Sequence, residues 1–275
     1  MAKRSLTIGL ILPDVLGTYG DDGNALVLRQ RARMRGIDAQ IRPVRLTDEV
    51  PSDCDIYTLG GGEDAAQVLA AARLAASPGL QSAAAAGTPI FAACAGMQIL
   101  GHSFFANGAE AQGISLLDVT TSPLSTRATG EVASKPSRAG ITAELTEPLS
   151  GFENHMGATE LGPDASPLGK VTRGIGNGAT TNGAATNGAG TGNGTEAKPR
   201  PGTATGADTR PDTGAGAVEG VVQGSVVATY MHGPALARNP QLADLLLARA
   251  LDVRLSELEP LELPEIDRLR MERLN

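Results

Sequence analysis

Cys94 stands where an apolar stretch meets a helix-forming one, in the sequence Pro89-Ile-Phe-Ala-Ala-Cys94-Ala-Gly96-Met-Gln98. The pattern predicts a buried strand over Pro89–Ala93 that turns directly into a helix. Such a turn exposes its side chain at the sheet edge, beside the unpaired N–H groups of the first helical turn. That environment favours the thiolate, the nucleophilic form of cysteine. Cys94 is therefore a candidate nucleophile; the alternative is a small buried hydrophobic residue, the usual state of a free cysteine.

A thiolate that attacks an amide needs N–H donors where negative charge develops on oxygen. The glycine run 60–62 follows a predicted strand, Asp55–Leu59. The carboxyl ends of parallel strands meet at one edge of a sheet, where ligands bind. The glycine run and the N–H of Ala95 could supply the donors. The alternative for the glycines is a tight turn without a ligand.

The chain has three histidines that could act as the base for this thiol. His232 follows an apolar strand and is the better candidate by position. His155 lies in a glycine-bounded turn and is the second candidate, or a wall of the site. His102 lies at the end of the helix that follows Cys94 and is interpreted as a capping or surface residue.

The elements around these residues alternate as in a doubly wound, mostly parallel α/β sheet. Strands are predicted at Leu6–Leu12, Ile37–Val44, Asp55–Leu59 and Pro89–Ala93. One helix is predicted to end at Arg35, and others are predicted over Ala65–Ala76, Leu80–Ala86 and Asn239–Leu251. Asp22 or Asn24 could cap the start of the first helix, and Gly36 could end it in the left-handed conformation. Beyond Gly101, short strands at Ser115–Leu117, Ala128–Ala133, Gly140–Glu144 and Leu149–Glu153 suggest edge hairpins, and Val218–Val222 and Ser225–Tyr230 a further pair.

Composition predicts one domain over residues 1–253, interrupted by a low-complexity insertion at 174–216, and a partly ordered tail at 254–275. The insertion is rich in Gly, Ala, Thr and Asn, so it cannot bury enough apolar surface to offset its conformational entropy. We expect it to be a disordered surface loop, which adds little closure cost.

Charge and hydropathy exclude several classes of protein. The net charge is −7, and no basic stripe is interleaved with aromatic residues, which argues against nucleic-acid binding. The apolar start of the chain resembles a signal peptide but is stopped by Pro13-Asp14 without a cleavage site, so it is interpreted as a strand. No stretch has the length of a transmembrane helix. With Cys54 and Cys94 as the only cysteines, no disulfide framework or cysteine-rich metal site is expected. The predicted location is cytoplasmic.

Five motifs occur in an order that is typical of one enzyme family: Gly60-Gly-Gly-Glu63-Asp64, Cys94-Ala-Gly-Met-Gln98, Thr126-Arg127-Ala-Thr-Gly130-Glu131, Gly151-Phe-Glu-Asn-His155-Met-Gly157 and Tyr230-Met-His232-Gly-Pro234. With them the chain resembles the class I glutamine amidotransferases of the cobyric acid synthase type. Within that family it more closely resembles the glutaminase subunits of lipid II isoglutaminyl synthases. The resemblance covers nearly the whole chain except the insertion and the tail.

The resemblance implies a three-layer, flavodoxin-like fold and assigns roles to particular residues. Cys94 would be the nucleophile and His232 its base and acid. Gly61 and Ala95 would donate N–H groups to the oxyanion. Arg127 and Gln98 would bind glutamine or support its pocket, and a guanidinium suits the α-carboxylate of that substrate.

The resemblance also implies a partner. A MurT-type ligase subunit, in a heterodimer with this chain, would use ATP and the released ammonia to amidate the D-glutamate α-carboxyl of the lipid II stem peptide to D-isoglutamine. ATP and Mg²⁺ are expected on that ligase, because this chain has no Gly-x4-Gly-Lys-Ser/Thr loop; no cofactor or metal is expected here. Two alternatives remain: amidation in another pathway, such as that of corrinoids, and a non-catalytic binding module.

Two positions depart from the family pattern. Ala92 replaces the first glycine of the usual Gly-x-Cys-x-Gly elbow, and its small size preserves the turn. Pro234 replaces the glutamate that orients the imidazole in many class I enzymes. The chain therefore lacks an evident third member of a catalytic triad, and an acidic residue of the partner ligase is expected to complete it.

Overall fold

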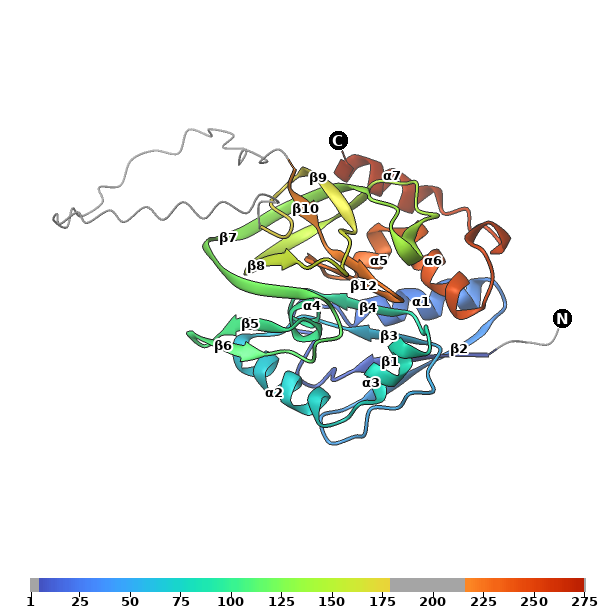
Figure 1. The fold of residues 1–275 in the computed structure, drawn as a ribbon. Helices are drawn as coiled ribbons and strands as arrows, with labels where there is room; N and C mark the ends of the chain where they lie inside the picture. The colour runs from blue at the N-terminus through green and yellow to red at the C-terminus, as the bar shows by residue number, and fades with distance from the viewer. Residues whose placement is uncertain (1–4, 179–215, 275) are drawn as a thin grey trace.

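The main sheet has six strands in the order β11-β12-β4-β3-β1-β2, in a computed structural model that describes residues 5–178 and 216–274 (Figure 1). All neighbouring strands run parallel except β11, which is antiparallel to β12. The strands are β1 (Ser5–Ile11), β2 (Asp38–Val44), β3 (Ile56–Leu59), β4 (Ile90–Ala93), β11 (Val221–Gln223) and β12 (Val226–Thr229). The predicted doubly wound parallel sheet is confirmed.

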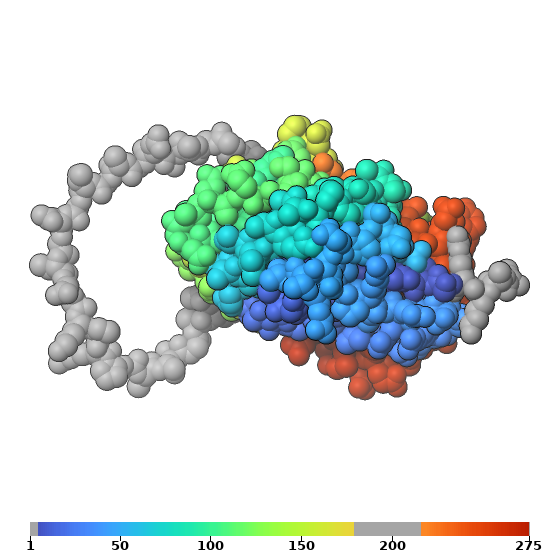
Figure 2. Space-filling model, turned by 90° about the horizontal axis from the view of Figure 1, so that it is seen from below, coloured from blue at the N-terminus to red at the C-terminus, as the bar shows by residue number. Residues whose placement is uncertain are grey.

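Helices bury both faces of this sheet. One face is covered by α1 (Gly23–Met34) and α6 (Pro240–Ala250), and the other by α2 (Asp64–Ala75), α3 (Gly79–Ala85) and α4 (Ala95–Leu100). Phe91 of β4 packs on the face that α1 and α6 cover. The neighbouring Ile90 packs on the opposite face, against α2, α3 and α4. Because both faces are buried, the inner strands β3, β4 and β12 are buried at every residue, whereas the edge strand β2 is partly exposed. Figure 2 shows the surface formed largely by the N-terminal half, coloured blue to cyan.

A second sheet lies beside the main one and contains β10-β9-β7-β5-β6, with β8 paired to both β7 and β13 (Figure 1). Its strands are β5 (Ser103–Ala106), β6 (Ala109–Gln112), β7 (Val119–Pro136), β8 (Leu149–Leu161), β9 (Gly169–Arg173), β10 (Val218–Glu219) and β13 (Met231–His232). β7 and β8 are longer than the strands predicted there, Ala128–Ala133 and Leu149–Glu153. The strand predicted at Gly140–Glu144 is wrong, because Gly140–Thr142 forms a 3₁₀ turn. Ser115–Leu117 is not a strand either: the N–H groups of Leu116 and Leu117 both donate to Leu100.

The first helix begins without the predicted side-chain cap. It starts at Gly23, and neither Asp22 nor Asn24 caps it. The Asn24 amide instead donates to the carbonyl of Asp21 at 2.9 Å and accepts the N–H of Leu236 at 3.0 Å. Asn24 therefore ties the loop after β1 to α5 (Ala235–Arg238). The predicted left-handed end at Gly36 is confirmed, with φ 71°.

The beginning of the insertion is held more firmly than its composition predicts. Glu153 on β8 accepts the N–H groups of Ile175 at 2.7 Å and Gly176 at 2.8 Å. Asn177 is buried and exchanges two hydrogen bonds with the backbone of Gly220. Disorder was the wrong prediction for residues 174–178, because buried polar side chains satisfy their backbone groups. The rest of the predicted insertion, 179–215, lies outside the described residues.

The tail forms a 3₁₀ turn at Leu255–Glu257 and a helix, α7 (Pro264–Leu274), which packs on β8. Arg270 anchors α7 through Glu147 and the carbonyl of Pro148. Among the described residues, none of the helices has the length and apolar character required to cross a bilayer.

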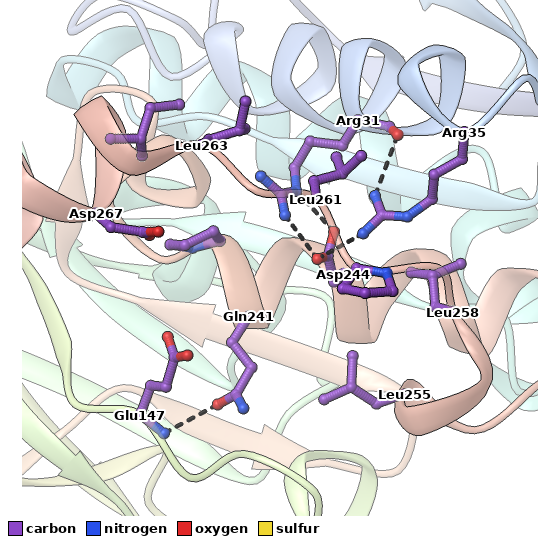
Figure 3. Close-up of a pocket in the computed structure, with 13 residues that line it drawn as sticks. Arg31, Arg35, Glu147, Gln241, Asp244, Leu255, Leu258, Leu261, Leu263 and Asp267 are labelled. Carbon is purple, nitrogen blue, oxygen red and sulfur yellow. Dashed lines mark hydrogen bonds and ion pairs between the residues drawn. The ribbon is translucent and has the colours of Figure 1, made fainter.

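A cavity of about 270 Å³ lies between α1, α6 and the segment that leads into α7 (Figure 3). Arg31 of α1 and Arg35, which directly follows this helix, point to one carboxylate, Asp244, at 2.6 and 2.8 Å. All three side chains are largely buried. The charges of Arg31, Arg35 and Asp244 beside the cavity are thus paired with one another.

We expect Asp244→Ala to destabilise the fold by about 3 kcal/mol, because it leaves two buried guanidinium groups without their carboxylate. Asp53→Ala is the matched control: its pair with Arg42 is exposed, and its loss should cost no more than about 1 kcal/mol. Urea unfolding measures both. Equal losses in the two variants would contradict this account of α1 and α6 packing.

Candidate active site

Cys94 occupies the predicted turn between β4 and α4 and has a strained backbone, with φ 48° and ψ −110°. Its N–H donates to the carbonyl of Thr229 at 2.7 Å, which fixes the turn against β12. Gly96 lets the turn approach β3 closely, because a Cβ there would lie 3.0 Å from the carbonyl oxygen of Gly60 and 3.1 Å from the Cβ of Leu59. A non-glycine residue with positive φ at a strand end is typical of a functional position.

His232 lies next to this turn and is held by an acidic residue of the same chain. Its Nδ1 atom is 3.3 Å from Oδ2 of Asp21, in the loop between β1 and α1. Its Nε2 atom is buried without a hydrogen-bond partner among the described residues. The histidine predicted from position is thus at the site, and Nε2 is the nitrogen left to exchange a proton with the Cys94 thiol.

The electrostatics of His232 favour the imidazolium. Burial lowers the pKa of His232, but the neighbouring Asp21 carboxylate and Cys94 sulfur outweigh burial and raise this pKa to about 10. A thiolate beside an imidazolium is the reactive state of a cysteine–histidine pair. The site can therefore hold a nucleophile and a proton donor together.

Asp21 corrects one expectation from the sequence. A partner residue was expected to complete the triad, yet the Asp21 carboxylate of this chain already contacts the imidazole. Its side chain is fully buried. The signal in the sequence was an acidic residue in the loop after the first parallel strand, at the edge where Cys94 and His232 were expected to meet.

Gly61 lies between the catalytic side chains, but its N–H is already engaged. It donates to Oδ2 of Asp21 at 2.8 Å. To serve as an oxyanion donor, this N–H must turn from Asp21 to the substrate. Ala95 is the first residue of α4, so its N–H belongs to the unpaired donors of a helix start. Both oxyanion roles remain predictions.

We expect Gly61→Ala to lower kcat by roughly 10- to 100-fold, because small displacements of reacting groups have effects of this size. The new Cβ would lie 3.0 Å from Cε1 of His232, 3.1 Å from Oδ2 of Asp21 and 3.3 Å from Cβ of Cys94. A thermal melt should show a folded protein. Unchanged kcat in a folded variant would contradict this crowding.

Tyr19 lies beside the catalytic residues, near Arg127 of the second sheet. The Tyr19 ring lies 4.5 Å from the His232 ring, and its hydroxyl donates to Glu63 at 2.9 Å. That hydrogen bond raises the pKa of Tyr19, and the charges of Cys94 and Arg127 also act on it. Arg127 is exposed on β7, where it donates to Asn154. Its position permits the predicted contact with glutamine, which stays a prediction; the sequence did not single out Tyr19.

Gln98 belongs to a buried network rather than to the open site. Its Oε1 accepts from Gln67 at 2.7 Å, and its Nε2 donates to the Tyr230 hydroxyl at 2.9 Å. The Tyr230 hydroxyl also contacts Thr159 at 2.6 Å. Both ends of the Gln98 amide are therefore used inside the protein, which favours pocket support over direct binding of substrate.

The other two histidines lie elsewhere. His155 stacks on the Tyr230 ring at 3.6 Å and contacts the carbonyl of Gly157 through Nδ1. It thus packs in the same buried cluster as Tyr230, and its role as a wall of the site stays a prediction. His102 is exposed and contacts Asp118 at 3.0 Å, so the surface interpretation is consistent with the structure.

Sequence comparisons find glutamine amidotransferases among the proteins similar to this chain. The CobB/CobQ-like glutamine amidotransferase domain matches residues 7–196. The chain is 31% identical over 263 residues to the lipid II isoglutaminyl synthase (glutamine-hydrolyzing) subunit GatD of Staphylococcus aureus, covering 94% of this chain and 90% of that protein. It is 29% identical over 250 residues to the corresponding subunit of Streptococcus pneumoniae, covering 90% and 80%. A solved structure, the glutaminase domain of Trypanosoma brucei CTPS with bound acivicin, aligns with a TM-score of 0.48 at 12% identity, covering 95% of this chain and 98% of that one.

The match to the domain extends from β1 into the insertion and includes Asp21, the glycine run and Cys94. The chain belongs to the CobB/CobQ-like glutamine amidotransferase family.

Proposed function

We propose that this chain is the glutaminase subunit of a lipid II isoglutaminyl synthase and supplies ammonia to a MurT-type ligase partner. The observation that carries the chemistry is the strained turn that holds Cys94 beside His232, with Asp21 on the far side of the imidazole. The similarity to two GatD subunits over at least 80% of each supports the pathway.

The reaction begins with attack of the Cys94 thiolate on the side-chain amide carbon of glutamine. The carbonyl oxygen becomes an oxyanion, which needs N–H donors such as those of Ala95 and Gly61. The His232 imidazolium gives its proton to the amide nitrogen, the C–N bond breaks, and ammonia leaves. A glutamyl thioester remains on Cys94.

Water completes the cycle. Neutral His232 takes a proton from water, which attacks the thioester carbon. The C–S bond breaks, glutamate leaves, and the thiolate–imidazolium pair is restored. Asp21 holds Nδ1 throughout, so that Nε2 faces the reacting atoms in both steps.

The ammonia passes to the ligase, where we propose that ATP and Mg²⁺ bind and the D-glutamate α-carboxyl of the lipid II stem peptide is activated. We place this work in the cytoplasm, where ATP is available to the ligase. The product is D-isoglutamine. The proposed assembly is a heterodimer.

Co-purification with a Mur-type ligase of the same organism, followed by an amidation assay, tests this function. Glutamine labelled with heavy nitrogen in its side-chain amide, ATP and lipid II should yield D-isoglutamine carrying the label. A complex with Cys94→Ser is the control: it should fail with glutamine and still work with an ammonium salt. Hydrolysis of glutamine without any labelled lipid II would leave the enzyme class intact and refute the proposed acceptor.

A further inference from the structure

Thr229, the last residue of β12, connects both catalytic residues. Its carbonyl accepts the N–H of Cys94 at 2.7 Å. Its hydroxyl oxygen accepts the N–H of Met231 at 3.0 Å, in the turn that leads to His232. One residue therefore sets the nucleophile through its backbone and the base through its side chain.

Glu219, a buried carboxylate from the other sheet, holds this threonine. Its Oε1 accepts the hydroxyl proton of Thr229 and, at 3.0 Å, the N–H of Tyr230. Because a hydroxyl has a single proton, its donation to Glu219 leaves the lone pairs of Thr229 for the N–H of Met231. The hydrogen bonds thus have one consistent direction, from the His232 turn through Thr229 to Glu219.

Burial of the Glu219 carboxylate costs free energy. Its side chain is fully buried, and Oε2 has no hydrogen-bond partner among the described residues. Burial raises the pKa of Glu219 to about 7, against the hydrogen bonds from Thr229 and Tyr230, and the charge of Glu153 adds to the rise. An apolar side chain would avoid this desolvation, so the carboxylate is better explained by what it holds.

We propose that Glu219, acting through the hydroxyl of Thr229, is a positioning residue that fixes His232 relative to Cys94. The proposal rests on the proposed glutamine hydrolysis, in which the imidazole must face the sulfur in both steps. It extends the catalytic machinery to a residue that touches no substrate atom.

Kinetics of single and double variants test the inference in the full chain with its ligase. Thr229→Val and Glu219→Leu should each lower kcat by roughly 10- to 100-fold, with KM for glutamine changed by less than about 3-fold. Thr229→Ser and Glu219→Gln keep the hydroxyl and the acceptor oxygen, so they should stay within about 5-fold of wild type. The Thr229→Val, Glu219→Leu double variant should be no slower than the worse single variant, because both act on one hydrogen-bonded unit.

A second measurement does not depend on turnover. Alkylation of Cys94 by iodoacetamide reports the imidazole beside it, so Thr229→Val and Glu219→Leu should react more slowly near neutral pH and need more alkaline solution to reach the wild-type rate. Glu153→Gln is the control: this carboxylate holds Ile175 and Gly176 instead, and alkylation should match wild type.

The outcomes separate the two claims. Wild-type protein that never hydrolyses glutamine, with or without the ligase, contradicts the proposed function, while alkylation still reports on positioning. If wild type is active but the Thr229→Val and Glu219→Leu variants match it in kcat and alkylation, the positioning role is wrong. Additive losses of kcat with unchanged alkylation would also overturn it, since they indicate a structural effect. If Glu219→Leu does not fold, Thr229→Val against Thr229→Ser decides the question.

Discussion

Cys94→Ser should lower the kcat of glutamine hydrolysis by roughly 10⁴-fold or more, because removal of a catalytic nucleophile has effects of this size. A serine hydroxyl is a much weaker nucleophile at neutral pH than a cysteine thiolate. The side chain is nearly the same size, so the thermal melt should stay close to that of wild type. Ammonia release, measured with the ligase present, gives kcat.

Cys54→Ser provides the comparison. Cys54 is also buried, and burial raises the pKa of its thiol, so it should be unreactive. Its replacement should leave kcat within about 3-fold and lower stability modestly, by about 1 kcal/mol, because a hydroxyl replaces a buried apolar thiol. Substantial hydrolysis by the Cys94→Ser variant, or loss of activity in the Cys54→Ser variant only, would refute the assignment of the nucleophile.

Asp21→Asn should have the second-largest effect, a loss of kcat by roughly 10²- to 10⁴-fold. The new amide can donate to Nδ1 of His232, which would place the imidazole proton on Nε2. That tautomer cannot accept a proton from the thiol or from water. Asp22→Asn is the matched control, because no hydrogen bond or ion pair of the described residues joins the Asp22 carboxylate to the imidazole, and it should retain kcat within about 3-fold. Equal effects of the two replacements would contradict the orienting role of Asp21.

Asp21→Asn should also change how the free energy of unfolding depends on pH. The pKa of His232 is raised from 6.5 to about 10 in the folded protein. The stabilisation that this shift provides is fully present below pH 6.5 and is lost as the pH rises through about 10. Asp21→Asn removes one cause of the shift. Urea unfolding should therefore show the difference in free energy of unfolding between wild type and variant shrinking between these pH values; a difference that grows with pH would contradict the assignment.

The sequence predicted the parts of the site that follow directly from parallel strands. Cys94 ends one apolar run, the glycine run ends another, and His232 follows a third; the carboxyl ends of such strands share an edge. The strand-to-helix turn at Cys94 was predictable for the same reason, since the apolar run stops where helix-forming residues begin.

The sequence did not predict the site residues that lie away from the strand ends. Asp21 and Tyr19 lie in a loop of irregular backbone, and only folding brings Asp21 beside a histidine 211 residues away in the chain. The second sheet was also underestimated, because β7 pairs with β8 across a register shift between Pro123 and Ala128. An irregular ladder of this kind does not leave a simple alternating pattern.

Covalent labelling by a chloroketone analogue of glutamine, mapped by mass spectrometry of peptides, tests the reactive sulfur most directly. One equivalent should attach to Cys94 in the complex with the ligase, excess glutamine should slow the labelling, and Asp21→Asn should slow it further. Labelling at Cys54, or none on Cys94 in an active complex, would contradict the account.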